Sequence, residues 1–159
     1  MKFVADTMLG KLARWLRILG YDTMHESSAS LDDQLARASQ PDTVFLTRRK
    51  SLPDGSMQAN VYYVKAEKFD AQLREVVHRF GLDIECHVFT RCLDCNVEVQ
   101  PVAKDSVRGK VPEKSFDGFD TFFQCPTCQA ISWSGVHLTN TKNKLKRIFS
   151  EQSTESFKE

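Results

Sequence analysis

The sequence predicts an α/β fold over its first 90 residues, followed by a smaller part of different character. Two observations lead to this view. Up to residue 90, short β-branched and aromatic runs alternate with segments of helical periodicity, and four of the five cysteines then fall within residues 91–129. Alternation of this kind favours a parallel sheet with helices packed on it. We therefore expect an α/β domain at 1–90, a cysteine-rich module at 91–140, and a basic helix with a polar tail at 141–159.

The first domain is expected to contain four strands and three helices. The strands are the apolar or β-branched runs at residues 2–5, 21–25, 43–47 and 61–64. The helices show apolar residues at helical spacing and have recognisable ends. They are residues 9–19 before Gly20, residues 31–38 with Ser30 as N-cap, and residues 71–80 before Gly81.

The rest of the chain predicts a small antiparallel module. Its expected strands are residues 97–99, 121–124 and 131–134, with short helices at 104–109 and 113–119 between the first two. A last helix is predicted over 143–150, and the serine-rich end after it is expected to fray.

Composition excludes several classes of protein. The chain has 159 residues, a net charge of +1 and 41% hydrophobic residues, so it is neither wholly disordered nor globally cationic. We find no apolar run of the roughly 18 residues that span a bilayer and no secretory leader. An odd number of cysteines favours a reducing compartment, cytoplasmic or nuclear.

The cysteine spacing predicts a structural zinc site. Cys92-x2-Cys95 and Cys125-x2-Cys128 supply four thiolates that can close a tetrahedron around Zn²⁺. The segment between the pairs is longer than in most zinc ribbons, which indicates an insertion. An iron–sulfur cluster is the alternative. His137 is interpreted as structural or at the surface, and Cys86 as an incidental thiol.

Candidate catalytic acids lie at the ends of predicted elements, and cations that could contact RNA occur in three groups. Asp6 ends the first strand, where catalytic groups of parallel sheets gather. Asp32 and Asp33 begin the second helix, where acids also serve the helix dipole. Cations that could follow an RNA backbone occur in three groups: Lys11, Arg14 and Arg17; Arg48, Arg49 and Lys50; and Lys142, Lys144, Lys146 and Arg147.

These residues carry a resemblance to a known family. FVADTMLGKLARWLRILGYDT, FLTRRKSL, FTRCLDCN and CPTC with W-x-G-x-H resemble the Mut-seven C-terminal RNase-like family over about residues 1–140. The resemblance implies a PIN-like nuclease domain plus a zinc ribbon, in which a few acids hold Mg²⁺ or Mn²⁺. Members of this family occur as free-standing proteins in bacteria and archaea. They also form the C-terminal domain of animal Mut-seven-type 3′–5′ exoribonucleases, and we favour this second context for the present chain.

One departure from the family pattern changes the expected activity. After the third strand the family has T-R-D-[RK], whereas here Arg49 replaces the acid. Asp6 and Asp33 carry over as vestigial catalytic residues. We therefore expect an accessory RNA-binding module of an exoribonuclease in RNA processing or silencing, not itself an enzyme, with single-stranded RNA or a protein as partner.

Two other functions stay open at this point. The chain could be an active metal-dependent ribonuclease that completes its site with Asp22, Asp32 or Asp54, using Mg²⁺ or Mn²⁺. It could also be a protein-docking module. The aromatic residues Trp133, Phe122 and Phe123 could stack on bases, but we interpret them as filling a small core beside the metal.

Overall fold

The computed structural model describes residues 1–52, 60–133 and 135–150. The chain divides into two compact units, Met1–Asn96 and a second that begins at Val97. Each is described by itself below.

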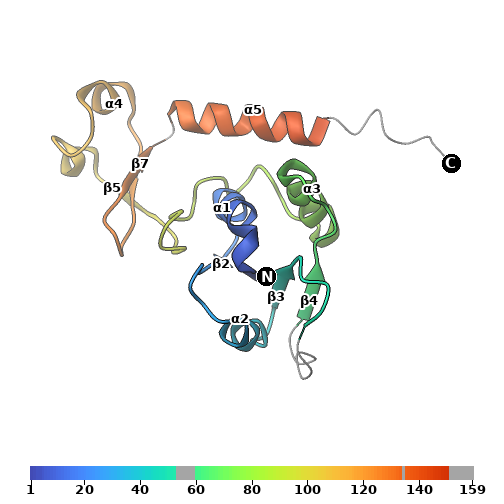
Figure 1. The fold of residues 1–159 in the computed structure, drawn as a ribbon. Coiled ribbons are helices and arrows are strands. Elements are labelled where there is room, and N and C mark those ends of the chain that lie inside the picture. Colours follow the sequence, from blue (N-terminus) through green and yellow to red (C-terminus); the bar gives the residue numbers. More distant parts are fainter. Residues whose placement is uncertain (53–59, 134, 151–159) are drawn as a thin grey trace. The chain divides into compact units, whose positions relative to one another are not determined.

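The first unit is built on a four-stranded parallel sheet, as expected. The strands are β1 (Lys2–Ala5), β2 (Thr23–Met24), β3 (Thr43–Thr47) and β4 (Asn60–Tyr63), in the order β2-β1-β3-β4 (Figure 1). Central β1 and β3 are paired so that Ala5 lies beside Leu46. Residues that follow these two strands therefore emerge at the same edge of the sheet.

Helices cover both faces of this sheet. α2 (Leu31–Ala38) packs on one face, and α1 (Gly10–Ile18) and α3 (Phe69–Phe80) lie on the other, as Figure 1 shows. The α2 face is closed by a cluster of apolar side chains from the helix and the central strands. Its buried members are Val4, Leu35, Ala38 and Phe45. All five residues of β3 are buried, as a central strand with two covered faces requires.

The second unit contains a three-stranded antiparallel sheet. Its strands are β5 (Gln100–Val102), β6 (Phe122–Gln124) and β7 (Ile131–Trp133), in that order. The 3-10 turn η3 (Lys104–Val107) and the short helix α4 (Glu113–Gly118) lie between β5 and β6 in sequence. A small core joins these elements to the sheet through Val107, Phe116 and Phe122, with Trp133 packed against it.

Two predicted elements of this unit were misplaced. The strand expected at 97–99 lies at 100–102, where Pro101 is accommodated because β5 is at the edge of the sheet. The last helix, α5, runs over Val136–Ser150 and so begins before residue 143. Its threonines and asparagine have low intrinsic helix propensity and concealed the first turns from sequence reasoning.

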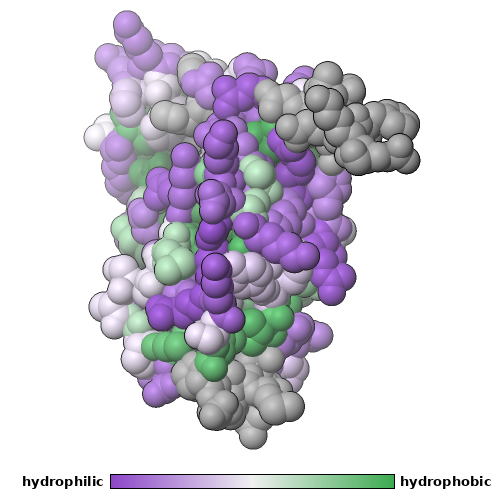
Figure 2. Space-filling view, turned by 45° about the vertical axis from the view of Figure 1, so that its right-hand side comes forward, coloured by the Kyte–Doolittle hydropathy of each residue, from purple (hydrophilic) through white to green (hydrophobic). Residues whose placement is uncertain are grey.

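The face of the molecule drawn in Figure 2 is mainly polar. Hydrophilic side chains dominate the face shown in Figure 2, and apolar ones form smaller green areas between them. The large apolar side chains that are exposed in the described residues are Met1, Met8 and Met24. No helix within the described ranges has both the length and the apolar character that crossing a bilayer requires.

Two glycines with positive φ allow a matched test of how closely the chain packs around Gly20. Gly20 has φ +92°, and a Cβ added there would lie 2.5 Å from the His87 carbonyl oxygen. Gly81, which ends α3, has φ +59° and open space around it. Gly81→Ala should cost about 1–2 kcal/mol of unfolding free energy for its backbone conformation alone. Gly20→Ala should cost clearly more in urea denaturation, and equal losses would contradict the described close approach.

Candidate functional site

Asp6 lies at the carboxyl edge of the sheet, directly after β1. Its backbone N–H donates to the Leu46 carbonyl, which continues the β1–β3 pairing by one residue. Its side chain also caps the 3-10 turn η1 (Thr7–Leu9), where Oδ1 accepts hydrogen bonds from Thr7 N and Thr7 Oγ1 at 2.7 and 3.2 Å. The carboxylate is fully buried.

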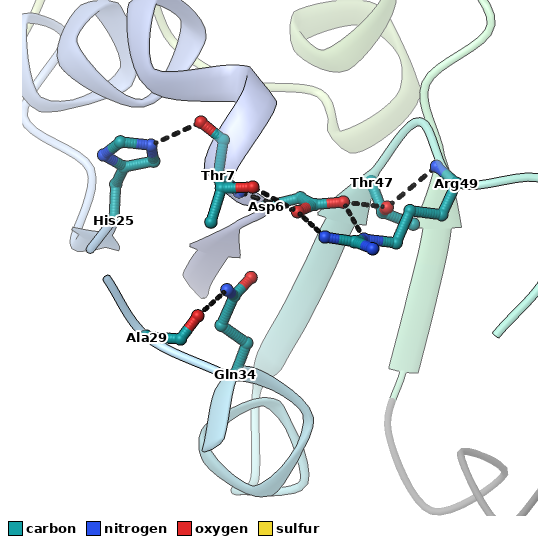
Figure 3. A network of polar contacts seen from close by, with 7 residues as sticks. All are labelled: Asp6, Thr7, His25, Ala29, Gln34, Thr47 and Arg49. Atoms are coloured by element: carbon teal, nitrogen blue, oxygen red, sulfur yellow. Dashed lines mark hydrogen bonds and ion pairs between the residues drawn. The ribbon is translucent and has the colours of Figure 1, made fainter. Parts of the chain in front are cut away.

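Arg49 forms a two-pronged ion pair with this buried carboxylate. Its Nε donates to Asp6 Oδ2 at 2.9 Å, and a terminal guanidinium nitrogen donates to Oδ1 at 3.3 Å. Thr47, the last residue of β3, also donates its hydroxyl to Oδ2 at 2.6 Å and accepts from Arg49 N (Figure 3). Both carboxylate oxygens of Asp6 therefore accept hydrogen bonds from residues at or just after the ends of two adjacent strands.

This arrangement favours the charged form of Asp6. Burial by itself raises the pKa of the carboxyl, but hydrogen bonds from Thr47, Arg49 and Thr7 and the charge of Arg49 outweigh it, so the pKa lies below the ordinary 3.8. Asp6 is thus an ionised hydrogen-bond acceptor at neutral pH, and its charge is balanced by the guanidinium.

Two further polar side chains, His25 and Gln34, border the same region. A ring nitrogen of His25, Nε2, lies 3.1 Å from the Thr7 carbonyl oxygen. Gln34 points from α2 toward Asp6 in Figure 3, and its amide nitrogen donates to Ala29 O at 3.0 Å. The buried side-chain oxygen of Gln34 has no hydrogen-bond partner among the described residues.

The other candidate acids are occupied elsewhere or exposed. Asp33 accepts from the Ser30 hydroxyl at 2.6 Å, and the same hydroxyl accepts from Asp33 N at 3.1 Å as the N-cap of α2. Asp22 accepts from the Asn96 amide at 2.7 Å. Asp32 is exposed in the first turn of α2. Asp54 lies outside the described residues.

The three cations of α1 differ in their environments. Lys11 lies over the Phe69 ring, 4.5 Å from its centroid, and exposed Arg14 is 3.7 Å from Asp94. Arg17 is half-buried and donates to the carbonyl oxygens of Thr23, Leu93 and Asp94. Its fixed contacts give Arg17 a structural role, whereas Lys11 and Arg14 reach solvent.

The cations after β3 and on α5 were also predicted from the sequence. Arg48 donates to Ala66 O and lies 3.9 Å from Glu67, while Lys50 is exposed. On α5, Lys142, Lys146 and Arg147 are exposed, Lys144 is half-buried, and Leu145 and Ile148 are buried.

The two C-x-x-C pairs adopt the same local backbone. In each, the residue after the second cysteine donates its N–H to the carbonyl of the first cysteine at 3.0 Å, from Asn96 to Cys92 and from Gln129 to Cys125. Both of these residues have positive φ, 59° and 62°. Backbone N–H groups also point at sulfur, with Cys95 N 3.5 Å from Cys92 Sγ and Cys128 N 3.5 Å from Cys125 Sγ.

The four cysteines converge, as their spacing predicted. The sulfur atoms of Cys92, Cys95, Cys125 and Cys128 all lie within 4.8 Å of one another. Four thiolates at this separation, with backbone N–H groups supporting the sulfurs, fit a tetrahedral Zn²⁺ without an open position for chemistry. Cys86 is exposed and outside the cluster, and the side chain of His137 lies outside the described part of the structure.

Sequence reasoning missed several residues that complete these sites. Thr47 and Thr7 donate hydrogen bonds to Asp6, and Gln34 borders it. Asn96 directly follows the first C-x-x-C pair, a turn called a cysteine knuckle below, and its amide donates to Asp22. Neutral residues of this kind carry no distinctive spacing. The position of Asn96 directly after C-x-x-C was the one available signal, because a knuckle favours a residue that tolerates positive φ there.

The lowered pKa of Asp6 predicts how stability depends on pH. A carboxyl whose folded pKa is depressed contributes stability that is complete above its unfolded value, near 3.8, and is lost as pH falls through the folded value. Asp6→Asn should therefore lower the unfolding free energy at pH 7 by about 2–3 kcal/mol, the scale of hydrogen bonds to a charged group. Its deficit should shrink below pH 4 in chemical denaturation. Exposed Asp32→Asn is the control, and a pH-independent deficit would contradict the assignment.

Zinc content gives a second prediction. The protein purified in zinc-containing medium should carry about one ion per chain by elemental analysis. Cys128→Ser should lose that ion and lower the thermal unfolding temperature, because structural zinc supplies folding free energy. Cys86→Ser provides the matched control, since it removes a thiol outside the cluster. Full zinc content in Cys128→Ser would refute the four-thiolate site.

Comparison with known families agrees with this geometry. A model of the Mut7-C RNAse domain matches residues 1–145, which include Asp6, Arg49 and all four clustered cysteines. No curated protein and no solved structure matches the chain. The match confirms the resemblance noted in the sequence, and an RNase domain implies RNA as the substrate class. The chain belongs to the Mut7-C RNAse domain family.

Proposed function

We propose that this chain binds single-stranded RNA and does not cleave it. In this view it is an accessory domain of a 3′–5′ exoribonuclease in RNA processing or silencing, and it guides RNA to a separate catalytic domain. The observation that carries the proposal is the ion pair between Arg49 and Asp6.

Electrostatics disfavours a hydrolytic cation at Asp6. A metal-dependent nuclease needs several carboxylate oxygens that converge on Mg²⁺ or Mn²⁺. Both oxygens of Asp6 are instead bonded by Arg49, Thr47 and Thr7. Two unit charges about 4 Å apart interact by about 4 kcal/mol at an effective dielectric of 20, and a divalent ion would feel about twice that repulsion from the guanidinium.

The neighbouring acids support the same conclusion. Within residues 1–52, 60–133 and 135–150, the four cysteines are the one set of His, Cys, Asp or Glu side chains close enough together to hold a metal. Asp33 is committed to the helix cap with Ser30, and Asp22 to Asn96. Asp6 therefore has no described carboxylate with which to share a cation.

The exposed cations favour contacts to RNA phosphates. Lys11 and Arg14 reach solvent on α1, and Lys50 follows β3 at the edge where Asp6 lies. On α5, Lys142 and Lys146 are four residues apart and exposed, so they share one face of the helix. Contacts of this kind attach the protein to the RNA backbone without recognising the RNA sequence, and they weaken steeply as the salt concentration rises.

An RNA-binding and cleavage assay on the whole chain tests the proposal. We expect labelled single-stranded RNA to bind with strong salt dependence and to stay intact with Mg²⁺ or Mn²⁺. Lys50→Glu should weaken binding and reduce the slope of log affinity against log salt by about 1. Lys2→Glu is the matched control, because Lys2 is also exposed but begins β1 and so lies at the amino ends of the strands.

The family match favours a second candidate, an active ribonuclease. Metal-dependent cleavage that is lost in Asp6→Asn would establish this activity and overturn the proposal. Absence of RNA binding at moderate salt would also overturn it and would leave a protein-docking role.

A further inference from the structure

A groove in the second unit lies outside the region of Asp6 and the cations discussed above. Its volume is about 660 Å³, within the roughly 300–1,000 Å³ range of small-molecule sites. The wall is formed by β7, the end of β6, the second cysteine knuckle and the turn before α4. The lining residues used below are Trp133, Ile131, Pro112, Lys110, Gln124 and Gln129.

An aromatic ring supported from behind forms part of this wall. Trp133 is half-buried on β7, and its ring packs against buried Phe122 with centroids 6.1 Å apart. The same side chain therefore belongs to the small core and borders the groove. Ile131 and Pro112 add apolar surface beside it. A supported tryptophan is a good platform for a planar ligand, and base stacking is worth roughly 1–3 kcal/mol per base.

The polar groups of the groove are held by the knuckle. The Gln124 amide nitrogen donates to Gln129 O at 3.1 Å, and the Gln129 amide nitrogen donates to Pro126 O at 3.0 Å. The backbone of Gln129 is itself fixed by its hydrogen bond to Cys125 O. Both side chains use nitrogens in these bonds, so their carbonyl oxygens can accept from the amine of a base.

The charge at the groove fits an anion. Lys104 pairs with Asp120 at 2.9 Å, and Arg108 pairs with Asp105 at 3.3 Å. Lys110 is exposed, lines the groove and forms no ion pair with residues in the described ranges. Lys110 is therefore a cation at the groove that can contact a phosphate.

We propose that this groove binds one nucleotide of single-stranded RNA. The base stacks on Trp133 with its edge toward Gln124 and Gln129, and a phosphate contacts Lys110. The inference rests on the proposed RNA binding and adds a base-contacting site to its backbone contacts. RNA is favoured over a peptide because an aromatic wall, amide acceptors and a cation available for a phosphate occur together, in a family whose substrate class is RNA.

Tryptophan fluorescence of the full chain tests this site. The chain has two tryptophans, so Trp15→Phe leaves Trp133 as the reporter. Short oligouridine and oligoadenylate should quench its fluorescence on binding. In that background, Lys110→Ala and Gln129→Ala should weaken the affinity measured by quenching. Trp133→Leu, made in the natural chain and followed by filter binding, should weaken RNA affinity by roughly fivefold or more, the loss of one stacked base.

The controls separate this inference from the proposed function. Lys114→Ala removes an exposed lysine of α4 that does not line the groove, and should change nothing. If the chain binds RNA but Trp133 is not quenched and Lys110→Ala binds normally, the groove assignment is wrong and RNA binding elsewhere stands. If no RNA binds, both proposals fail. Quenching by a proline-rich peptide but not by RNA would overturn the nucleotide site.

Discussion

The pairing of β1 with β3 is the constraint on which the first site depends. Because these strands are parallel and adjacent, Asp6 leaves the sheet beside Thr47, and Arg49 follows two residues later. A fully buried carboxylate is costly unless it is paired and hydrogen-bonded. Arg49, Thr47 and Thr7 meet that requirement, and together they bond both carboxylate oxygens of Asp6.

Two of the four clustered cysteines, Cys125 and Cys128, belong to the small second unit. Its sheet has three strands of three residues each, and its core is built around Phe122. Small modules of this size commonly need a metal or disulfides in addition to an apolar core. Zinc held by the four thiolates would supply that stability. The hydrogen bond from Gln129 N to the Cys125 carbonyl fixes the backbone after the second C-x-x-C pair, which forms part of the wall of the proposed nucleotide groove.

Sequence reasoning succeeded where local pattern and tertiary structure agree. The strands at 2–5 and 43–47 and the helix at 31–38 were predicted with their observed bounds, because each combines clear periodicity with a recognisable end. It failed where tertiary pairing prevails. The position of β5 is set by its pairing with β6, so the strand lies at 100–102 and not at the valine-containing run 97–99. α5 extends through residues of low helix propensity.

The replacement of an expected acid by Arg49 is what the family resemblance implies. By itself, the sequence determined the α/β class and four thiols spaced so that they could hold a metal. These follow from residue identity, periodicity and spacing, which need no coordinates. Only the tertiary structure decided that Arg49 bonds both oxygens of Asp6, that Asp33 serves a helix cap, and that Trp133 borders a groove with Lys110. Such contacts join residues far apart in the chain, and their distances are set by packing that no local pattern encodes.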